Sequence, residues 1–287
     1  MPEEKSNLLR NPWKIFFWEA FLFFLTLLLG MASALRQIKL QEKGVIVPPP
    51  PISIERFIVS VLFLVLIILL VIKFVKFRFG KGIFFKAVFI FSVFFGGIIF
   101  LELWMGTILA LFLILFLTIF WVRKANVFIH NLLLILGIAG IGSVLGLSLE
   151  PIFIVILLGL FSIYDVIAVY KTKHMVKMAE EMVQAKAIPG LILPQRFSEI
   201  KASLDEVKIG GKFLILGGGD IIFPLLLVSS LIPQGFWQAF IVAVFAVIGL
   251  FVSFWIFISQ KTRKPIPALP PIALFSVLGY LLISFIK

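Results

Sequence analysis

The chain has 287 residues, of which 62% are hydrophobic and only 14% charged, a composition typical of integral membrane proteins and unlike that of soluble domains. In such a chain the formal net charge of +12 is expected to set orientation in the bilayer, so it does not indicate a nucleic-acid partner. No cysteine is present, which excludes disulfides and thiol catalysis, and with only two histidines we expect no metal site and no cofactor.

Nine apolar segments are long enough, or nearly so, to span a bilayer. They cover residues 15–35, 57–76, 83–103, 105–122, 127–147, 151–170, 213–232, 236–259 and 268–286. The sequence therefore predicts an all-α, polytopic membrane protein whose nine transmembrane helices form one bundle.

Lysine and arginine are distributed unevenly between alternate loops. On the side of the N-terminus lie 21 of the 26 basic residues, and 5 lie on the other side. Because basic residues concentrate in cytoplasmic loops, this predicts a multi-pass cell-membrane protein with its N-terminus in the cytoplasm and its C-terminus outside. Ala32-Ser33-Ala34 could alternatively mark signal-peptidase cleavage, but the preceding apolar run of about 20 residues exceeds the ~7 to 15 of a signal peptide.

Two connecting segments stand out. Residues 36–56 contain four consecutive prolines from Pro48, which predict a stiff, extended spacer. Residues 171–212 form the one long cytoplasmic loop, where helical spacing of apolar residues predicts an amphipathic helix over 173–186. Residues 189–194 and 206–209 have the composition of short extended pieces.

Two of the three aspartates lie inside predicted spans. Asp165 precedes the cytoplasmic end of the sixth span by about 9 Å, and Asp220 follows the start of the seventh by about 12 Å. An ionised carboxylate inside a bilayer is costly, so both are expected to face the bundle interior and to serve function. Two close carboxylates in a low-dielectric site share one proton, which equips them for acid and base catalysis in aspartic proteolysis.

Glycine and proline mark two further segments. Gly217, Gly218 and Gly219 directly precede Asp220 and would let the backbone unwind and a neighbouring chain approach. A small-residue packing face explains the glycines alone, but not the acid beside them. Four prolines over residues 265–271 predict a rigid, extended segment before the last helix.

Three short motifs occur in order: Tyr164-Asp165, Gly217-Gly218-Gly219-Asp220 and Pro267-Ala268-Leu269. Together they resemble the YD, GxGD and PAL signatures of the presenilin and signal-peptide-peptidase family of intramembrane aspartyl proteases, and the compact chain is similar to a prokaryotic, archaeal-type homologue. The predicted cytoplasmic N-terminus resembles the presenilin branch of the family. The sequence of residues 220–224, in contrast, is more similar to the signal-peptide-peptidase branch.

The resemblance implies that Asp165 and Asp220 are the catalytic pair, supported by Tyr164 and the three glycines. It also implies that Pro267, Ala268 and Leu269 shape substrate access. We accordingly divide the chain into helices 1–5 (1–147) and a catalytic part (148–287), acting on transmembrane proteins or peptides among membrane lipids. No oligomeric state is predicted.

The extended pieces support a hypothesis about substrate binding. An unwound substrate could add as a strand to residues 191–193 or 207–209, presenting its amide through backbone hydrogen bonds. Packing of these segments on the membrane surface explains them equally well.

Two other functions fit part of the pattern. A proton- or cation-coupled transporter could use Asp165 and Asp220, but it should show broken helices in two related halves. A prepilin-peptidase-like enzyme would not need the Pro-Ala-Leu segment. Among the remaining polar residues, Glu19 and Glu102 are expected to reach the interface, His130 to hydrogen-bond between helices, and His174 to be solvated.

Overall fold

The structure is a computed structural model, and it describes residues 12–47, 54–59, 62, 66, 81–172, 174–208, 211–260 and 264–286. The predicted second span, 57–76, lies largely outside this part of the chain. Of the predicted spacer, 36–56, the first residues are not extended but continue the first helix to Glu42, and the four prolines lie outside the described residues. The fold class holds in its coarse form, a mainly helical membrane protein, but nine spans are not established.

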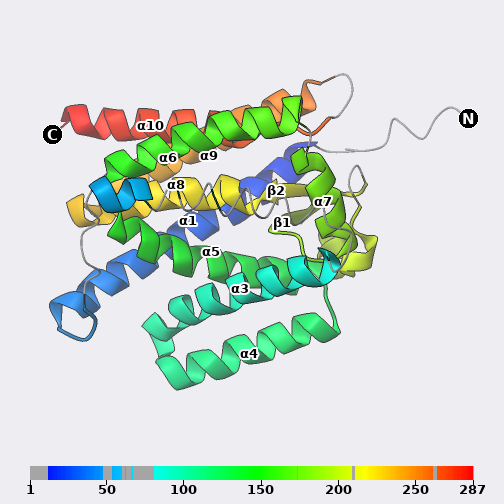
Figure 1. The fold of residues 1–287 in the computed structure, drawn as a ribbon, viewed down its shortest axis with the longest axis horizontal. Coiled ribbons are helices and arrows are strands. Elements are labelled where there is room, and N and C mark those ends of the chain that lie inside the picture. Colours follow the sequence, from blue (N-terminus) through cyan, green and yellow to red (C-terminus); the bar gives the residue numbers. More distant parts are fainter. Residues whose placement is uncertain are drawn as a thin grey trace, which may run out of the picture.

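Long helices run roughly side by side along one direction, and a small sheet closes one end (Figure 1). The helices are α1 (Pro12–Glu42), α3 (Lys81–Met105), α4 (Thr107–Arg123), α5 (Val127–Ser148), α6 (Pro151–Val166), α7 (His174–Gln184), α8 (Gly218–Leu231), α9 (Phe236–Ile258) and α10 (Leu269–Ile286). The sheet pairs β1 (Gly190–Pro194) with β2 (Phe213–Gly217), and a π-helical turn (Ile167–Lys171) and three short 3-10 turns (Phe197–Lys201, Leu204–Glu206, Ile232–Gln234) complete the elements.

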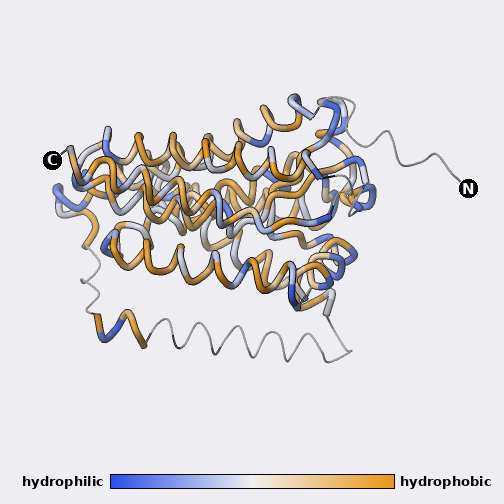
Figure 2. The backbone as a smooth tube through the Cα atoms, turned by 90° about the horizontal axis from the view of Figure 1, so that it is seen from above, coloured by the Kyte–Doolittle hydropathy of each residue, from blue (hydrophilic) through white to orange (hydrophobic). Residues whose placement is uncertain are grey.

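The hydropathy of the residues varies along the length of the bundle. Hydrophobic residues cover the helix shafts and hydrophilic ones gather at the two ends of the bundle (Figure 2). Within the described residues, α1, α3, α5, α6 with its π turn, and α9 are long and apolar enough to cross a membrane, and α4, α8 and α10 are apolar but shorter. The α1 helix continues unbroken through Ala32-Ser33-Ala34, with Ser33 and Ala34 buried, as expected of a span.

Helix α5 lies at the centre of the bundle. It packs against α3, α8 and α1, while α8 also contacts α9 and α6. Most of α5 is buried, including the polar His130, Asn131 and Ser143. A helix surrounded by protein in this way can carry polar side chains without exposing them to lipid.

The long loop confirms one prediction and corrects another. Helix α7 forms within the predicted range, and Met178, Met182 and Val183 pack against the core. Residues 190–194 are extended as predicted and pair with Phe213–Gly217, whereas Glu206 ends a 3-10 turn and residues 207–208 belong to no strand. The predicted seventh span therefore begins as a strand, because glycine disfavours helix and the strand ladder satisfies the backbone groups.

Candidate active site

Asp165 lies on the last turn of α6, and only 7% of its surface is exposed. Directly after Val166 the helix widens into a π-helical turn, Ile167–Lys171, a feature that occurs frequently at functional sites. No feature of the sequence indicated this widening, which changes the backbone path immediately beyond the acid.

Asp220 is the third residue of α8, whose N-cap is Gly217. Its carboxyl group interacts with the Gly217 backbone N–H. An acid at this position that reaches back to the N-cap is one half of a capping box, and it satisfies a helix N–H that otherwise has no partner. The motif thus ends a strand, begins a helix and fixes the carboxylate at their junction.

Asp165 and Asp220 lie on helices that pack against each other, α6 and α8. The charge of Asp165 acts on Asp220. One turn away from each aspartate, Phe161 of α6 and Phe223 of α8 pack with ring centroids 4.4 Å apart, which locks the two helices at the same level. This contact is consistent with the common level estimated from the sequence, which did not point to these two aromatic residues.

The Pro-Ala-Leu segment reaches this site through its backbone. Residues 264–268 have no regular structure, as predicted, and α10 begins at Leu269. The Leu269 N–H donates to Asp165 Oδ2 at 3.3 Å, in a buried position. Pro267 and Leu269 are buried and Ala268 is half-buried. The prolines at 270 and 271 fit the first turn of a helix, where a missing N–H costs little.

The three glycines have different surroundings. A Cβ at Gly217 would lie 2.9 Å from Asp220 Oδ2, and a Cβ at Gly218 would lie 2.9 Å from the Pro189 carbonyl oxygen. At Gly219 a Cβ would meet only the Phe223 ring, at 3.8 Å. Gly218 is therefore required by close approach to backbone, and at Gly217 a side chain would displace the Asp220 carboxylate. Gly219 is exposed and has room for a methyl group beside Asp220.

Two polar side chains of α5 hold the sheet that leads to Asp220. Asn131 donates from Nδ2 to the Ile192 carbonyl and accepts the Ile192 N–H on Oδ1, both at 2.8 Å. His130 Nε2 lies 3.2 Å from the Gly190 carbonyl oxygen, so its predicted hydrogen bond exists but joins a helix to a strand. Asn131 was missed by the sequence analysis, although a buried amide in an apolar span was the available signal.

Glu19 overturns one expectation. It was predicted to reach the membrane interface, but it is only 5% exposed inside the bundle, and its Oε2 atom has no hydrogen-bond partner in the part of the chain that the structure describes. The Asp220 carboxylate acts on it electrostatically. The reason is that α1 packs directly against α8, a proximity that hydropathy does not encode. Glu102 is exposed, as expected, and accepts a hydrogen bond from Thr107 at 2.6 Å.

Strand addition at residues 191–193 is contradicted by the structure, and at residues 207–209 it is not tested in full. Leu191 and Leu193 face β2, and Ile192 is bonded to Asn131, so both edges of β1 are occupied. Val207 is buried after a 3-10 turn and donates its N–H to Leu204, while residue 209 is outside the described part. Among the described residues no cluster of three His, Cys, Asp or Glu side chains could hold a metal ion.

Comparison with known proteins agrees with this fold. A sequence model described as signal-peptide peptidase and presenilin aspartyl protease matches residues 21–287. One solved structure, a presenilin family intramembrane aspartate protease in space group C222, superposes with a TM-score of 0.63 at 21% identity, covering 95% of this chain and 99% of that one. A second, in space group P2, gives 0.57 at 22% identity, covering 92% and 97%.

No curated protein matches the chain significantly. At these identities the solved structures establish the fold, and the sequence model covers nearly the whole chain. The chain therefore belongs to the signal-peptide-peptidase and presenilin family of intramembrane aspartyl proteases.

Proposed function

We propose that this protein hydrolyses peptide bonds within transmembrane segments, with Asp165 and Asp220 as its catalytic pair. The observation that carries the proposal is that two acids lie inside an apolar bundle, where the charge of Asp165 acts on Asp220 and the Leu269 N–H donates to Asp165. A purely structural role would not retain two acids in such surroundings, because each costs free energy there.

The chemistry follows from the pairing. The two carboxyl groups hold one proton between them, since two adjacent charges in a low-dielectric site are unfavourable. The ionised group takes a proton from a water molecule, whose oxygen attacks the amide carbon. The protonated group donates to the carbonyl oxygen, and collapse of the tetrahedral intermediate breaks the C–N bond as the amine gains a proton.

The edge of β2 that has no strand partner among the described residues is the place we propose for the substrate. In the ladder, Leu214 and Leu216 face β1, so the backbone groups of Phe213 and Ile215 point to the other side. An extended substrate paired there runs toward Gly219, beside which the structure leaves open space. Strand addition recognises backbone and not sequence. A strand edge that can pair with a peptide backbone favours a peptide substrate over a transported ion.

The proposal also includes the division of the chain into residues 1–147 and 148–287 and the topology in the membrane. The paired acids and the Leu269 contact come from residues 148–287, while Glu19, His130 and Asn131 of the first part reach the same region. We propose nine spans, with residues 57–76 as the second, and a cytoplasmic N-terminus. The sheet and the aspartates then lie toward the cytoplasmic side, where most basic residues are.

The test is cleavage of a single-span reporter by the purified protein in detergent. Asp165→Ala and Asp220→Ala should each lower the cleavage rate by at least the factor of about 10² to 10⁴ associated with a lost acid or base. Glu102→Gln, which changes an exposed acid, is the matched control and should leave the rate unchanged. Wild-type cleavage that persists in either aspartate variant would exclude the pair as the catalyst.

A further inference from the structure

A basic cavity lies beside the long loop, away from the aspartates. Its volume is about 460 Å³, and it opens between the ends of α3, α4 and α5 and the segment after α7. Five cationic side chains and one carboxylate line it: Lys86, Arg123, Lys124, Lys186, Lys201 and Asp205. We call it the basic cavity.

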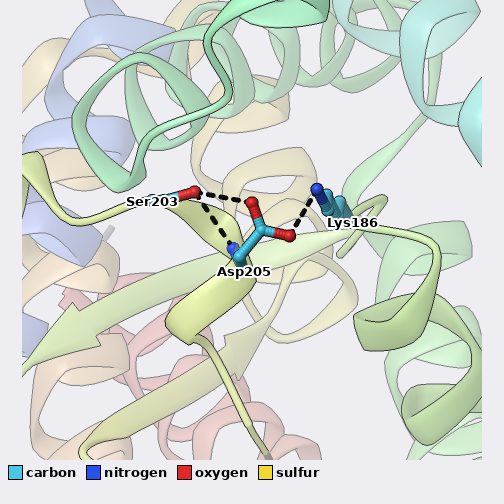
Figure 3. Close-up of polar contacts among 3 residues, drawn as sticks. All are labelled: Lys186, Ser203 and Asp205. Carbon is cyan, nitrogen blue, oxygen red and sulfur yellow. Dashed lines mark hydrogen bonds and ion pairs between the residues drawn. The ribbon is translucent and has the colours of Figure 1, made fainter.

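The single carboxylate is already neutralised. Lys186 forms an ion pair with Asp205, whose other oxygen accepts the Ser203 hydroxyl at 2.9 Å (Figure 3). These two hydrogen bonds lower the pKa of Asp205 below its ordinary value, so it stays charged and keeps its partner. The four other cations that line the cavity concentrate positive potential there.

Backbone hydrogen bonds hold the wall of the cavity in place. The Val127 N–H donates to the Ala202 carbonyl and the Leu204 N–H to the Ala125 carbonyl, both at 3.1 Å. Asn126 forms a bridge with Ser203 between these two bonds. The link between α4 and α5 is thereby fixed to the loop that carries Asp205.

A buried donor indicates what the cavity accepts. Trp121 lines it and is only 2% exposed, yet its indole N–H has no hydrogen-bond partner in the described part of the chain. Buried indole N–H groups normally find an acceptor. A ligand that supplies oxygen acceptors together with negative charge satisfies both the donor and the surrounding cations.

The cavity is also partly apolar and adjoins surface that faces lipid. Ile90, Val122 and Ala125 contribute apolar lining, and Val122 is 60% exposed. Along α4, Phe112, Phe116 and Ile119 are likewise exposed, so hydrocarbon chains can lie on this helix below the charged end. This favours an amphiphile over a free anion.

We propose that the basic cavity binds the phosphate headgroup of an anionic phospholipid, with the acyl chains lying along α4. Bound there, the lipid would brace the active-site sheet. One connection is Lys186, which precedes β1 by four residues and has a backbone φ of 56°. The other is α5, because its N-cap Asn126 lines the cavity and its Asn131 side chain is bonded to Ile192 of β1.

The experiment measures binding of short-chain phosphatidylglycerol to the purified protein by native mass spectrometry. Short-chain phosphatidylcholine and inorganic phosphate serve as comparison probes. Arg123→Gln with Lys201→Gln should weaken phosphatidylglycerol binding by about 30-fold, the effect of two basic residues at a lipid surface. Lys177→Gln with Lys208→Gln removes the same charge from exposed positions outside the cavity and should change binding by less than about twofold in physiological salt.

A second variant guards against misfolding of the first. Trp121→Phe keeps the aromatic packing and the charge but removes the indole N–H, and it should weaken phosphatidylglycerol binding while leaving the thermal midpoint without lipid near that of wild type. If the double variant at Lys177 and Lys208 loses as much phosphatidylglycerol affinity as the one at Arg123 and Lys201, the effect is one of general surface charge. That outcome would overturn the proposal. Inorganic phosphate binding as tightly as phosphatidylglycerol would overturn the assignment to lipid, and tight binding of phosphatidylcholine would overturn the requirement for an anion.

Discussion

Adding one methyl group at Gly218 or at Gly219 should have opposite effects on stability. Gly218→Ala places a Cβ 2.9 Å from the Pro189 carbonyl oxygen, a backbone atom that cannot move without disturbing β1. We expect a cost of about 1 to 3 kcal/mol for this overpacking. The gain of up to about 1 kcal/mol for alanine over glycine in a helix offsets only part of it.

Gly219→Ala meets no such obstacle. Its Cβ would lie 3.8 Å from the Phe223 ring, an ordinary contact. The helix preference of alanine should therefore leave the free protein as stable as wild type or more stable by up to about 1 kcal/mol. If a substrate strand occupies the open space beside this residue, the same methyl group should reduce cleavage mainly by raising KM.

Thermal unfolding of both variants in one detergent, together with reporter kinetics, tests this reasoning. The expected order of midpoints is Gly218→Ala below wild type and Gly219→Ala at or above it. A Gly219→Ala protein that is as destabilised as Gly218→Ala would refute the packing argument. Unchanged kinetics in a stable Gly219→Ala protein would refute passage of the substrate beside Gly219.

Three further variants test the surroundings of the site. Asn131→Leu leaves the Ile192 N–H and carbonyl unpaired, which should cost about 2 to 6 kcal/mol in denaturant titration, and an unchanged midpoint would contradict the role of this amide. Glu19→Leu removes a buried oxygen that lacks a hydrogen-bond partner, and it should raise the free energy of unfolding by about 1 to 3 kcal/mol while slowing cleavage. A lower free energy of unfolding would show that the carboxyl group does have a hydrogen-bond partner. Asp205→Asn should be less stable than wild type at neutral pH, and because the folded pKa of Asp205 is lowered, the difference should disappear as pH falls below its ordinary value of 3.8. A difference that persists at lower pH would exclude the ion pair with Lys186 as its cause.

Much of the fold was determined by patterns local in sequence. Apolar run length predicted α5 and α9 because a helix that crosses a bilayer must be continuous and hydrophobic. Prolines near residue 270 set the start of α10, since proline fits only the first helical turn. The two intramembrane aspartates could be singled out because a charge in hydrocarbon is too costly to be retained without a function.

Tertiary structure alone decided the pairing of distant segments. Residues 213–217 read as the start of a span, and only the presence of β1 as a partner makes them a strand. Glu19 read as an interfacial residue, and only the packing of α1 on α8 places it near Asp220. Asn131 gained its role in the same way, from a strand about 60 residues further along the chain. Hydropathy and helical periodicity record which surfaces are apolar, but which surfaces meet depends on shape complementarity between helices, and that is a property of the assembled bundle.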